Sequence, residues 1–321
     1  MTVIVNMLAQ DHDHYMPLAV GDVTIPGVDL RLKRVRLGVM VGMLERIYID
    51  PELHVGEASF ARYITRVADR DIGPVMALPA FVVRAFRHRG IYVRRGSKVR
   101  AADLAGKTIG ISEWRATGNS WSRAVLSDAG VTTQDCKWIL ARADDTKKPP
   151  PSDELPSNVA FGKDSDNLVG LLASGAIDAF IAPLEPPTFY DAGCPIVRLF
   201  DDYEAAERDY FKRTGIYPGH HIVCVKRDFY EKHPDLTRAI YQGMDRSKRS
   251  WDAYAKIFGQ STPWLLREIE RAQELMGQDW RPYGIERNEA MIDALCRELF
   301  EQGLVPRRVD PSELFPDFEK W

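Results

Sequence analysis

Short apolar runs alternate with segments of helical spacing over the first 95 residues. Residues 3–8 form an apolar run that ends at a polar cluster, which predicts a buried strand leading into a loop. Residues 28–32 alternate apolar and polar positions like a half-buried strand, and residues 55–59 predict a short strand that runs into a helix. Residues 40–49 have helical spacing and residues 74–83 are strand-like.

The alternation continues in the middle of the chain, from about Gly96. Residues 144–156 are rich in proline and charge, which predicts an exposed loop. Strands are predicted at 108–111, 136–140 and 177–182, and helices at 117–126 and 167–174, the second of them closed by Gly175. Strands that alternate with helices predict mostly parallel sheets with helices on their faces.

The pattern changes after a further predicted strand at 222–225, because almost everything from 228 to 303 has helical spacing. The chain has 321 residues, which exceeds the size at which one hydrophobic core usually stops growing. We therefore expect two domains. Apolar residues make up 45% of the chain, which is enough for two cores without a disulfide or metal to hold them.

Charge and cysteine content narrow the function classes. The formal net charge is −3, which gives no electrostatic basis for binding nucleic acid or an anionic membrane surface. The four cysteines are far apart in the sequence, so we expect buried free thiols. The N-terminal residues lack the basic start and long apolar run of a secretory signal, and no stretch approaches the about 18 apolar residues of a membrane span. We expect a cytoplasmic protein.

Several short motifs, spread over nearly the whole chain, occur in a specific order. They are Asp11-His12-Asp13-His14, Val55-Gly56-Glu57-Ala58-Ser59, the segment 84–93 with Arg84, Arg87 and His88, Gly110-Ile111-Ser112-Glu113-Trp114, the segment 214–221 that ends in His220-His221, and the segments 283–288 and 301–304. In this order they resemble the 4,5-dihydroxyphthalate decarboxylase family, whose members share the type II periplasmic-binding-protein fold.

The resemblance implies an α/β protein with two lobes, mostly parallel sheets flanked by helices, and two hinge crossings between the lobes. One lobe is then discontinuous and comprises residues 1–95 and 220–321. The other comprises residues 96–219, and a ligand cleft lies between them.

The resemblance also implies a carbon–carbon lyase that decarboxylates a hydroxylated aromatic carboxylic acid similar to 4,5-dihydroxyphthalate, without a cofactor. The implied partner is a small aromatic carboxylate, with no nucleic acid and no membrane, and a homo-oligomer is compatible with it. Because one fold serves enzymes and binders, the alternative function is a solute-binding protein of an ABC-type uptake system for small organic or aromatic acids.

Four residues are predicted to carry the catalysis. His14 follows the first strand, where a histidine suits acid–base work near neutral pH. Glu57 lies in the predicted short strand at 55–59 that runs into a helix, and it is either a general acid with a raised pKa or an acceptor for a phenol. His88 and His221 are implied by their positions in the family motifs. His12 points away from His14 if their loop is extended, so it is the weaker candidate.

The remaining candidates are predicted to bind the substrate. An arginine fork matches a carboxylate, so Arg84 and Arg87 are candidate anchors, although an exposed edge strand would carry such charges too. Near the start of the helix at 117–126, backbone N–H groups are suited to an anion. The predicted substrate-binding residues are Ser59, Arg62, Arg84, Arg87, Glu113, Trp114, Thr117 and His220.

Two further points concern metal and substrate. The histidines with Asp11, Asp13 or Glu57 offer ligands that suit zinc or iron, but no tight ligand spacing is present, so no metal site is predicted. Family members usually place an arginine just after the strand that corresponds to 177–181, where this chain has Glu185 nearby instead. Glu185 would repel a carboxylate, so this departure bears on the substrate more than on the fold or the reaction.

Overall fold

The computed structural model describes residues 2–36, 42–145, 155–258 and 261–320. The chain forms two compact units, and each unit takes up more than one stretch of the sequence. Unit 1 comprises residues 1–84, 219–292 and 310–321, and unit 2 comprises residues 85–218 and 293–309.

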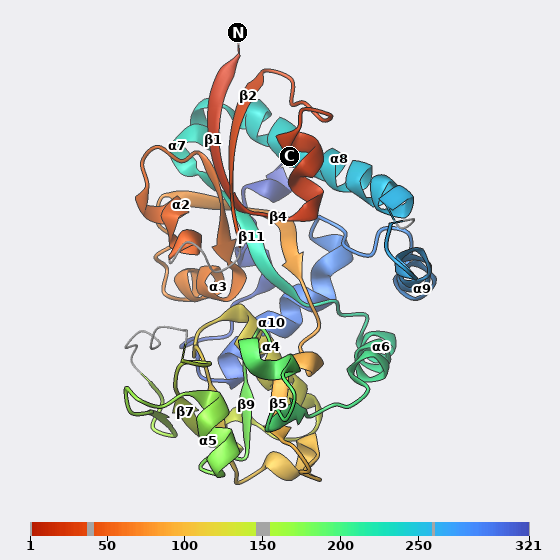
Figure 1. Ribbon diagram of the computed structural model, residues 1–321. Coiled ribbons are helices and arrows are strands. Elements are labelled where there is room, and N and C mark those ends of the chain that lie inside the picture. Colours follow the sequence, from red (N-terminus) through yellow and green to blue (C-terminus); the bar gives the residue numbers. More distant parts are fainter. Residues whose placement is uncertain (1, 37–41, 146–154, 259–260, 321) are drawn as a thin grey trace. The chain divides into compact units, whose positions relative to one another are not determined.

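Unit 1 is built on a five-stranded sheet in the order β2-β1-β3-β11-β4 (Figure 1). Its strands are β1 (Val3–Gln10), β2 (Val28–Val35), β3 (Val55–Ser59), β4 (Val75–Arg84) and β11 (Gly219–Lys226). Strand β1 pairs in parallel with β2 and β3, whereas β11 runs antiparallel to both β3 and β4. The carboxyl ends of β1, β3 and β4 and the beginning of β11 therefore meet at one edge of the sheet.

Helices cover the sheet of unit 1 and bury its apolar side chains. They are α1 (Met16–Ala19), α2 (Arg46–Ile49), α3 (Phe60–Ala68), α7 (Arg227–Lys232) and α8 (Pro234–Phe258), while α9 (Leu265–Met276) contacts α8. Val5, Leu78 and Val223 from the strands share one core with Ile240 and Met244 of α8. Burial of such side chains is the main favourable contribution to folding. The core thus fixes the strand ends against α8.

Unit 2 is built on a six-stranded sheet in the order β10-β5-β9-β6-β7-β8. Its strands are β5 (Ile91–Arg94), β6 (Thr108–Ile111), β7 (Lys137–Leu140), β8 (Val159–Phe161), β9 (Ala179–Ile181) and β10 (Ile196–Arg198). Strand β6 is parallel to β7 and β9, while β5 is antiparallel to β9 and β10. Both sheets are therefore mixed, because β5 and β11 enter them against the direction of their neighbours.

Of the described α-helices, α4 (Thr117–Asp128), α5 (Leu168–Ser174) and α6 (Tyr203–Thr214) belong wholly to unit 2. Helix α5 ends at Gly175, whose φ of 78° is left-handed, as expected for the glycine predicted to close it. At Gly110 of β6, a Cβ atom would lie 2.5 Å from Leu168 of α5. A glycine is therefore needed where this helix crosses the strand.

The course of the chain between the units differs from the predicted boundaries in two places. Residues 85–95 belong to unit 2, because β5 pairs with β9 and β10 there. Residues 293–309 also belong to unit 2, although α10 (Glu289–Glu301) begins in unit 1. In unit 2 the side chain of Gln302 accepts a hydrogen bond from Arg123 and donates to Ser120 O, so buried polar contacts hold this returning segment.

Some sequence predictions fall outside the described residues. They include the start of the predicted helix at 40–49 and most of the predicted loop at 144–156. The described part of 40–49 contains η2 (Met43–Glu45) and α2. The four cysteines are buried and free, as predicted. Of the described helices, none has an apolar stretch long enough to cross a membrane.

Candidate functional site

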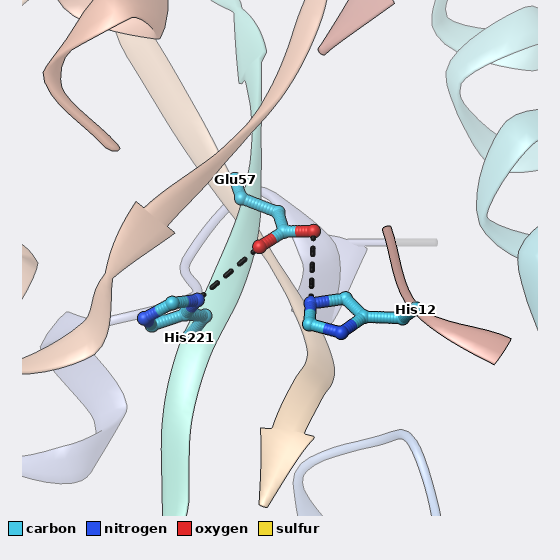
Figure 2. Close-up of side chains that lie close together, drawn as sticks. All are labelled: His12, Glu57 and His221. Atoms are coloured by element: carbon cyan, nitrogen blue, oxygen red, sulfur yellow. Dashed lines mark hydrogen bonds and ion pairs between the residues drawn. The ribbon is translucent and has the colours of Figure 1, made fainter. Parts of the chain in front are cut away.

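Three side chains meet at the sheet edge of unit 1 where β1 and β3 end and β11 begins. His12 follows β1, Glu57 lies in β3 and His221 lies near the start of β11. Figure 2 shows the carboxylate of Glu57 pointing toward both imidazole rings, with one oxygen facing each ring. The sequence distances are large, but strand pairing brings the three residues together.

Glu57 is fully buried and accepts hydrogen bonds on both carboxylate oxygens. The backbone N–H of Gln10 donates to Oε1 over 2.8 Å, and Oε1 also lies 3.4 Å from Nε2 of His12. Oε2 lies 3.2 Å from Nδ1 of His221. Burial by itself raises the pKa of Glu57, but the two imidazoles outweigh it and lower this pKa to about 2. The predicted raised pKa is therefore wrong, and Glu57 is an ionised acceptor.

The register of β11 places His221 beside Glu57. His221 pairs with Ser59 across the antiparallel β3, and Val223 pairs with Glu57, so His221 and Glu57 are diagonal neighbours. The pairing of β11 with β4 is irregular between Gly219 and Val223. Irregularities of this kind re-aim side chains and are common next to active sites. Since Nδ1 of His221 faces Glu57, its Nε2 is on the far side of the ring.

His12 and His14 are stacked rather than turned away from each other. Their ring centroids are 5.4 Å apart and the planes differ by 9°. The predicted divergence fails because residues 13–15 form a turn of 3-10 helix, η1 (Asp13–Tyr15), instead of an extended loop. His12 is the member that contacts Glu57, and 21% of its side chain is exposed compared with 3% for His14. His12 therefore belongs to the candidate site beside Glu57, although the sequence alone makes it the weaker candidate.

His14 is buried between charged groups. Its Nδ1 lies 3.2 Å from Oδ1 of Asp13 and 3.4 Å from Nη1 of Arg281. Burial lowers the pKa of His14 to about 4, with Arg281 acting in the same direction and Asp13 opposing it. His14 is therefore a neutral imidazole at neutral pH.

The cluster of His12, Glu57 and His221 also has the composition of a metal site. Each residue offers one ligand atom, and these atoms all lie within 4.8 Å of one another. Two imidazoles and one carboxylate suit zinc or iron among the common metal ions. Within the part of the chain that the structure describes, this is the one group of its kind. Acid–base chemistry and metal binding are thus the two uses that this arrangement allows.

Ser59 and Arg62 have structural contacts next to the cluster. The hydroxyl of Ser59 accepts from the backbone N–H of Arg62 over 3.5 Å and caps the start of α3. The guanidinium of Arg62 forms an ion pair of 3.1 Å with Glu45. These contacts give both residues a role in the local fold, beside which their predicted binding of substrate stays a prediction.

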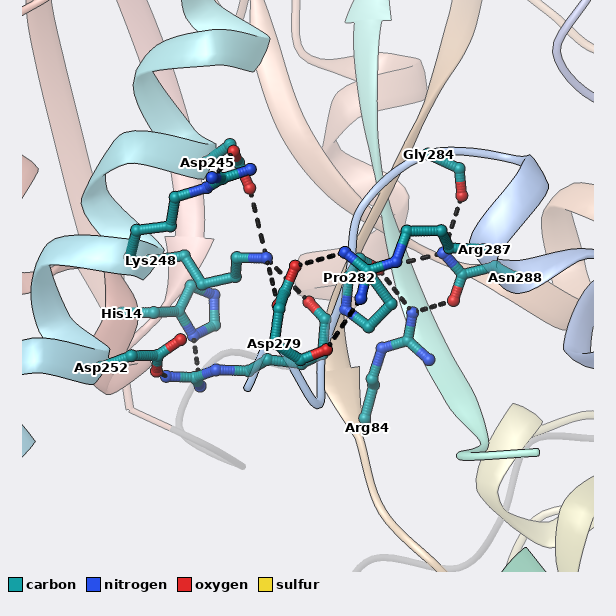
Figure 3. Close-up of polar contacts among 12 residues, drawn as sticks. His14, Arg84, Asp245, Lys248, Asp252, Asp279, Pro282, Gly284, Arg287 and Asn288 are labelled. Atoms are coloured by element: carbon teal, nitrogen blue, oxygen red, sulfur yellow. Dashed lines mark hydrogen bonds and ion pairs between the residues drawn. The ribbon is translucent and has the colours of Figure 1, made fainter. Parts of the chain in front are cut away.

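Arg84, at the end of β4, contacts the segment before α10. Its Nη2 donates to the carbonyl of Pro282 over 2.9 Å and to Oδ1 of Asn288. Asn288 in turn donates to the carbonyls of Pro282 and Gly284. These contacts connect Arg84 to residues 282–288 (Figure 3). Its role as a carboxylate anchor stays a prediction.

The predicted residues of unit 2 form a separate set. His88 is buried against the rings of Phe200 and Tyr210, with centroids 5.2 and 5.5 Å away, and burial lowers its pKa to about 4. Arg87 donates to the carbonyl of Pro183 over 3.1 Å and lies against Gly118, where a Cβ atom would be 2.9 Å from its Nη2. The guanidinium therefore lies beside the first turn of α4.

The other predicted residues have different surroundings. Trp114 is buried in the core of unit 2, edge-on to Trp138 at 5.6 Å and under the guanidinium of Arg123 at 4.3 Å. The carbonyl of Glu113 accepts from Asn119 over 2.7 Å, and Thr117 is the buried first residue of α4. His220 is buried within β11 of unit 1.

Glu185, the residue near the position of the family's usual arginine, has a cationic partner. Its Oε1 forms an ion pair of 2.7 Å with Nη2 of Arg198 in β10. The guanidinium of Arg198 also lies 4.6 Å from the ring centroid of Phe189. The negative charge that was predicted to repel a carboxylate is therefore balanced within unit 2.

Comparison with known sequences gives two similar decarboxylases. A 4,5-dihydroxyphthalate decarboxylase of Comamonas testosteroni is 32% identical over 323 residues, which cover 95% of this chain and 94% of the relative. Another from Pseudomonas putida is 31% identical over 211 residues, which cover 61% of this chain and 76% of the relative. No protein-family model matches the chain.

Comparison with solved structures identifies the fold. The periplasmic aliphatic sulphonate binding protein of Escherichia coli has a TM-score of 0.52 at 14% identity, covering 97% of this chain and 91% of that one. A periplasmic sulfonate-binding protein of Methylobacillus flagellatus has a TM-score of 0.57 at 14% identity, covering 98% and 91%. These similarities show that the chain has a periplasmic-binding-protein fold, as predicted.

Proposed function

The chain belongs to the 4,5-dihydroxyphthalate decarboxylase family, and we propose that it is a carbon–carbon lyase that removes CO2 from a hydroxylated aromatic carboxylic acid close to 4,5-dihydroxyphthalate. The whole-length similarity to the relative of Comamonas testosteroni supports the reaction class. The observation that carries the chemistry is the buried, ionised Glu57 between His12 and His221.

The cluster supplies the groups that this reaction needs without a cofactor. Decarboxylation of such a ring requires a proton donor for the ring carbon and a base for a ring hydroxyl. An imidazolium next to a buried carboxylate is stabilised in place, and two imidazoles allow one to donate while the other accepts. Exposed fractions of 21% for His12 and 14% for His221 leave both side chains in reach of a ligand, whereas Glu57 lies behind them.

On a ring that bears one hydroxyl and one carboxylate, protonated His221 donates a proton from Nε2 to the ring carbon that carries the carboxylate. Neutral His12 takes the hydroxyl proton. The carbon–carbon bond then breaks, its electron pair restores the aromatic ring as a phenolate, and CO2 leaves. The phenolate recovers a proton from His12, and solvent reprotonates His221. One proton is consumed for each CO2 released.

Glu57 contributes by orienting both rings and by offsetting their positive charge. Its carboxylate stays ionised because the Gln10 N–H donates to it, His221 hydrogen-bonds to it, and the imidazole of His12 lies 3.4 Å from it. Fixed charges of this kind in a water-poor site stabilise developing charge more strongly than water does. Glu57 therefore acts on the substrate through the two histidines.

The direct test is release of CO2 by the purified chain from 4,5-dihydroxyphthalate and a panel of mono- and dihydroxybenzoates. His221→Ala should lower turnover about 10²–10⁴-fold, which is the usual cost of losing a general acid. His233→Ala is the matched control, because His233 is a half-buried histidine of unit 1 that packs against Phe229. It should leave turnover unchanged.

Two outcomes would contradict the proposal in different ways. Tight binding of an aromatic acid with no CO2 release from any compound would make the chain a solute-binding protein. Turnover that appears only with added Zn²⁺ or Fe²⁺, and that a chelator abolishes, would replace the cofactor-free mechanism by a metal-assisted one at the same three residues.

A further inference from the structure

One ring nitrogen in the cluster of His12, Glu57 and His221 makes no hydrogen bond to any of the described residues. Nε2 of His12 is buried and lies 3.4 Å from Oε1 of Glu57, but the two atoms are not aligned as a hydrogen bond. Oε1 already accepts from the backbone N–H of Gln10 over 2.8 Å. Buried polar atoms are nearly always paired, so an exception of this kind points to an ion or ligand that binds beside it.

The distances within the cluster suit one metal ion. Zn²⁺ binds nitrogen and carboxylate oxygen at about 2.0–2.2 Å, so two ligands of a tetrahedral zinc site lie about 3.3–3.6 Å apart. Nε2 of His12 lies 3.4 Å from Oε1 of Glu57, and Nδ1 of His221 lies 3.2 Å from Oε2. The ligand atoms of all three residues lie within 4.8 Å of one another. Small rotations of these side chains would place them around a single ion (Figure 2).

The surroundings of the cluster favour the same three ligands. The N–H of Gln10 holds the carboxylate of Glu57 from behind, as contacts behind a metal ligand commonly do. The ring of His12 is stacked on His14, which restricts its orientation. Two histidines and one glutamate form the protein ligands of some catalytic zinc sites and leave the fourth position of the ion open.

Two nearby histidines of unit 1 are less suited to bind the ion. Nδ1 of His14 lies 3.4 Å from Nη1 of Arg281, and this fixed cation would repel a metal ion bound there. Nδ1 of His54 accepts from the backbone N–H of Asn6 over 3.0 Å, so its lone pair is already used. The geometry therefore selects His12 rather than His14 or His54.

We propose that His12, Glu57 and His221 bind one Zn²⁺ ion, and that the bound ion inhibits decarboxylation. The ion is bound through Nε2 of His12, Nδ1 of His221 and a carboxylate oxygen of Glu57. The inhibition rests on the function proposed above, whereas the binding of the ion does not. The cluster is then a site of regulation by metal as well as a centre for proton transfer.

Inhibition follows from the lone pairs that the ion occupies. A neutral imidazole has one lone pair, on the nitrogen that carries no proton. When Zn²⁺ holds this pair on His12, the ring cannot take the hydroxyl proton of the substrate. When Zn²⁺ holds Nδ1 of His221, the ring cannot form the imidazolium that donates from Nε2. Metal binding and the proposed proton transfer therefore exclude each other at both rings.

Isothermal titration calorimetry with Zn²⁺ on the full chain, freed of metal by a chelator, tests the site. One ion should bind per chain. His12→Ala, His221→Ala and Glu57→Gln should each weaken binding more than about 100-fold, since losing a contact behind a ligand already costs about 10–100-fold. Co²⁺ serves as a second probe, because the visible absorption of four-coordinate Co²⁺ should appear in the unchanged chain and be absent from the three variants.

The matched control for binding is His233→Ala, because His233 is a half-buried histidine of unit 1 outside the cluster. It should bind Zn²⁺ as the unchanged chain does. Far-UV circular dichroism checks that each variant is folded, and Glu57→Gln keeps the shape of the side chain where truncation would leave a void. Binding that persists in the three cluster variants, or that His233→Ala weakens equally, would overturn the site.

The inhibition is tested by CO2 release at increasing Zn²⁺. Turnover should fall in proportion to the share of chains that hold the ion, and a chelator should restore it. Mg²⁺ prefers oxygen ligands and should have no effect. Unchanged or increased turnover at Zn²⁺ concentrations that saturate the calorimetric site would overturn the inhibition. If no compound releases CO2 in the metal-free chain, the proposed function fails, while calorimetry still decides whether the cluster binds Zn²⁺.

Discussion

Two buried glutamates, one in each unit, respond to burial in opposite ways. Glu57 of unit 1 and Glu298 of unit 2 are 1% and 6% exposed. The pKa of Glu57 is lowered to about 2, whereas burial raises the pKa of Glu298 above its ordinary value. The same side chain at similar depth is thus held ionised in unit 1 and is pushed toward the neutral acid in unit 2.

The donors around each carboxylate account for the difference. Glu57 accepts from a backbone N–H and faces two imidazoles that become cations on protonation. Glu298 accepts from the neutral amide of Gln302 over 3.1 Å, and the nearest nitrogen of Arg297 is 3.6 Å away. Burial disfavours a charge unless donors to the charged form offset it. The donor set, more than depth, separates the proposed centre for proton transfer around Glu57 from the structural contact of Glu298.

The largest difference between the two glutamates should be in turnover, when each carboxylate is replaced by a neutral amide. Glu57→Gln should lower turnover about 10²–10⁴-fold, since both imidazoles lose the carboxylate that orients and stabilises them. Glu298→Gln is the matched substitution in unit 2 and should leave kcat within about twofold. CO2 release measured for both variants, with far-UV circular dichroism as a check of folding, would test this. Equal losses would erase the distinction between the two sites.

The next largest effect should appear in the pH dependence of stability, through the buried His14 of unit 1 and the buried His88 of unit 2. The pKa values of His14 and His88 are both lowered to about 4 from an ordinary value of 6.5. Between those values the unfolded chain binds protons that the native chain does not, so the free energy of unfolding falls as the pH falls from 6.5 to 4. Each histidine should account for about 3 kcal/mol of that loss.

Urea denaturation at several pH values would measure these contributions. His88→Phe keeps an aromatic ring against Phe200 and Tyr210 and should reduce the acid loss of stability by the share of one histidine. If His88→Phe has the same acid loss as the unchanged chain, His88 is protonated in the native state and its assignment is wrong.

The smallest effect should be the stability change in Glu298→Gln. Because its pKa is raised by folding, Glu298 favours the native state most at low pH, and that contribution is lost as the pH rises through its folded pKa. Replacement by glutamine should therefore stabilise the chain at pH 7 relative to pH 4. Thermal unfolding at both pH values would show it, and a larger gain at pH 4 than at pH 7 would contradict the sign.

Local pattern alone was enough for most of the framework. The apolar run at 3–8, the alternation at 28–32 and the strand at 55–59 correspond to β1, β2 and β3. The glycine that ends α5 and the change to helices after β11 were also evident from the sequence. These features depend on side-chain periodicity and turn chemistry, which neighbouring residues determine.

The site was only partly predictable, because its geometry depends on residues far apart in the chain. Glu57 and His221 were predicted, since family motifs contain them. The sequence favours His14 over His12 because an extended loop would turn the two rings apart, and only the turn at 13–15 stacks them with His12 beside Glu57. Arg281 had no local signal at all, since it reaches His14 across 267 residues of sequence.

The sequence by itself therefore determined the elements, the fold class and the family resemblance of this protein. Tertiary structure alone decided that β11 runs antiparallel to β3, which brings His221 beside Glu57, and that a buried cation faces His14. The reason is physical: periodicity and capping act over a few residues, whereas the protonation of a buried group depends on every charge within several ångströms, whatever its place in the chain.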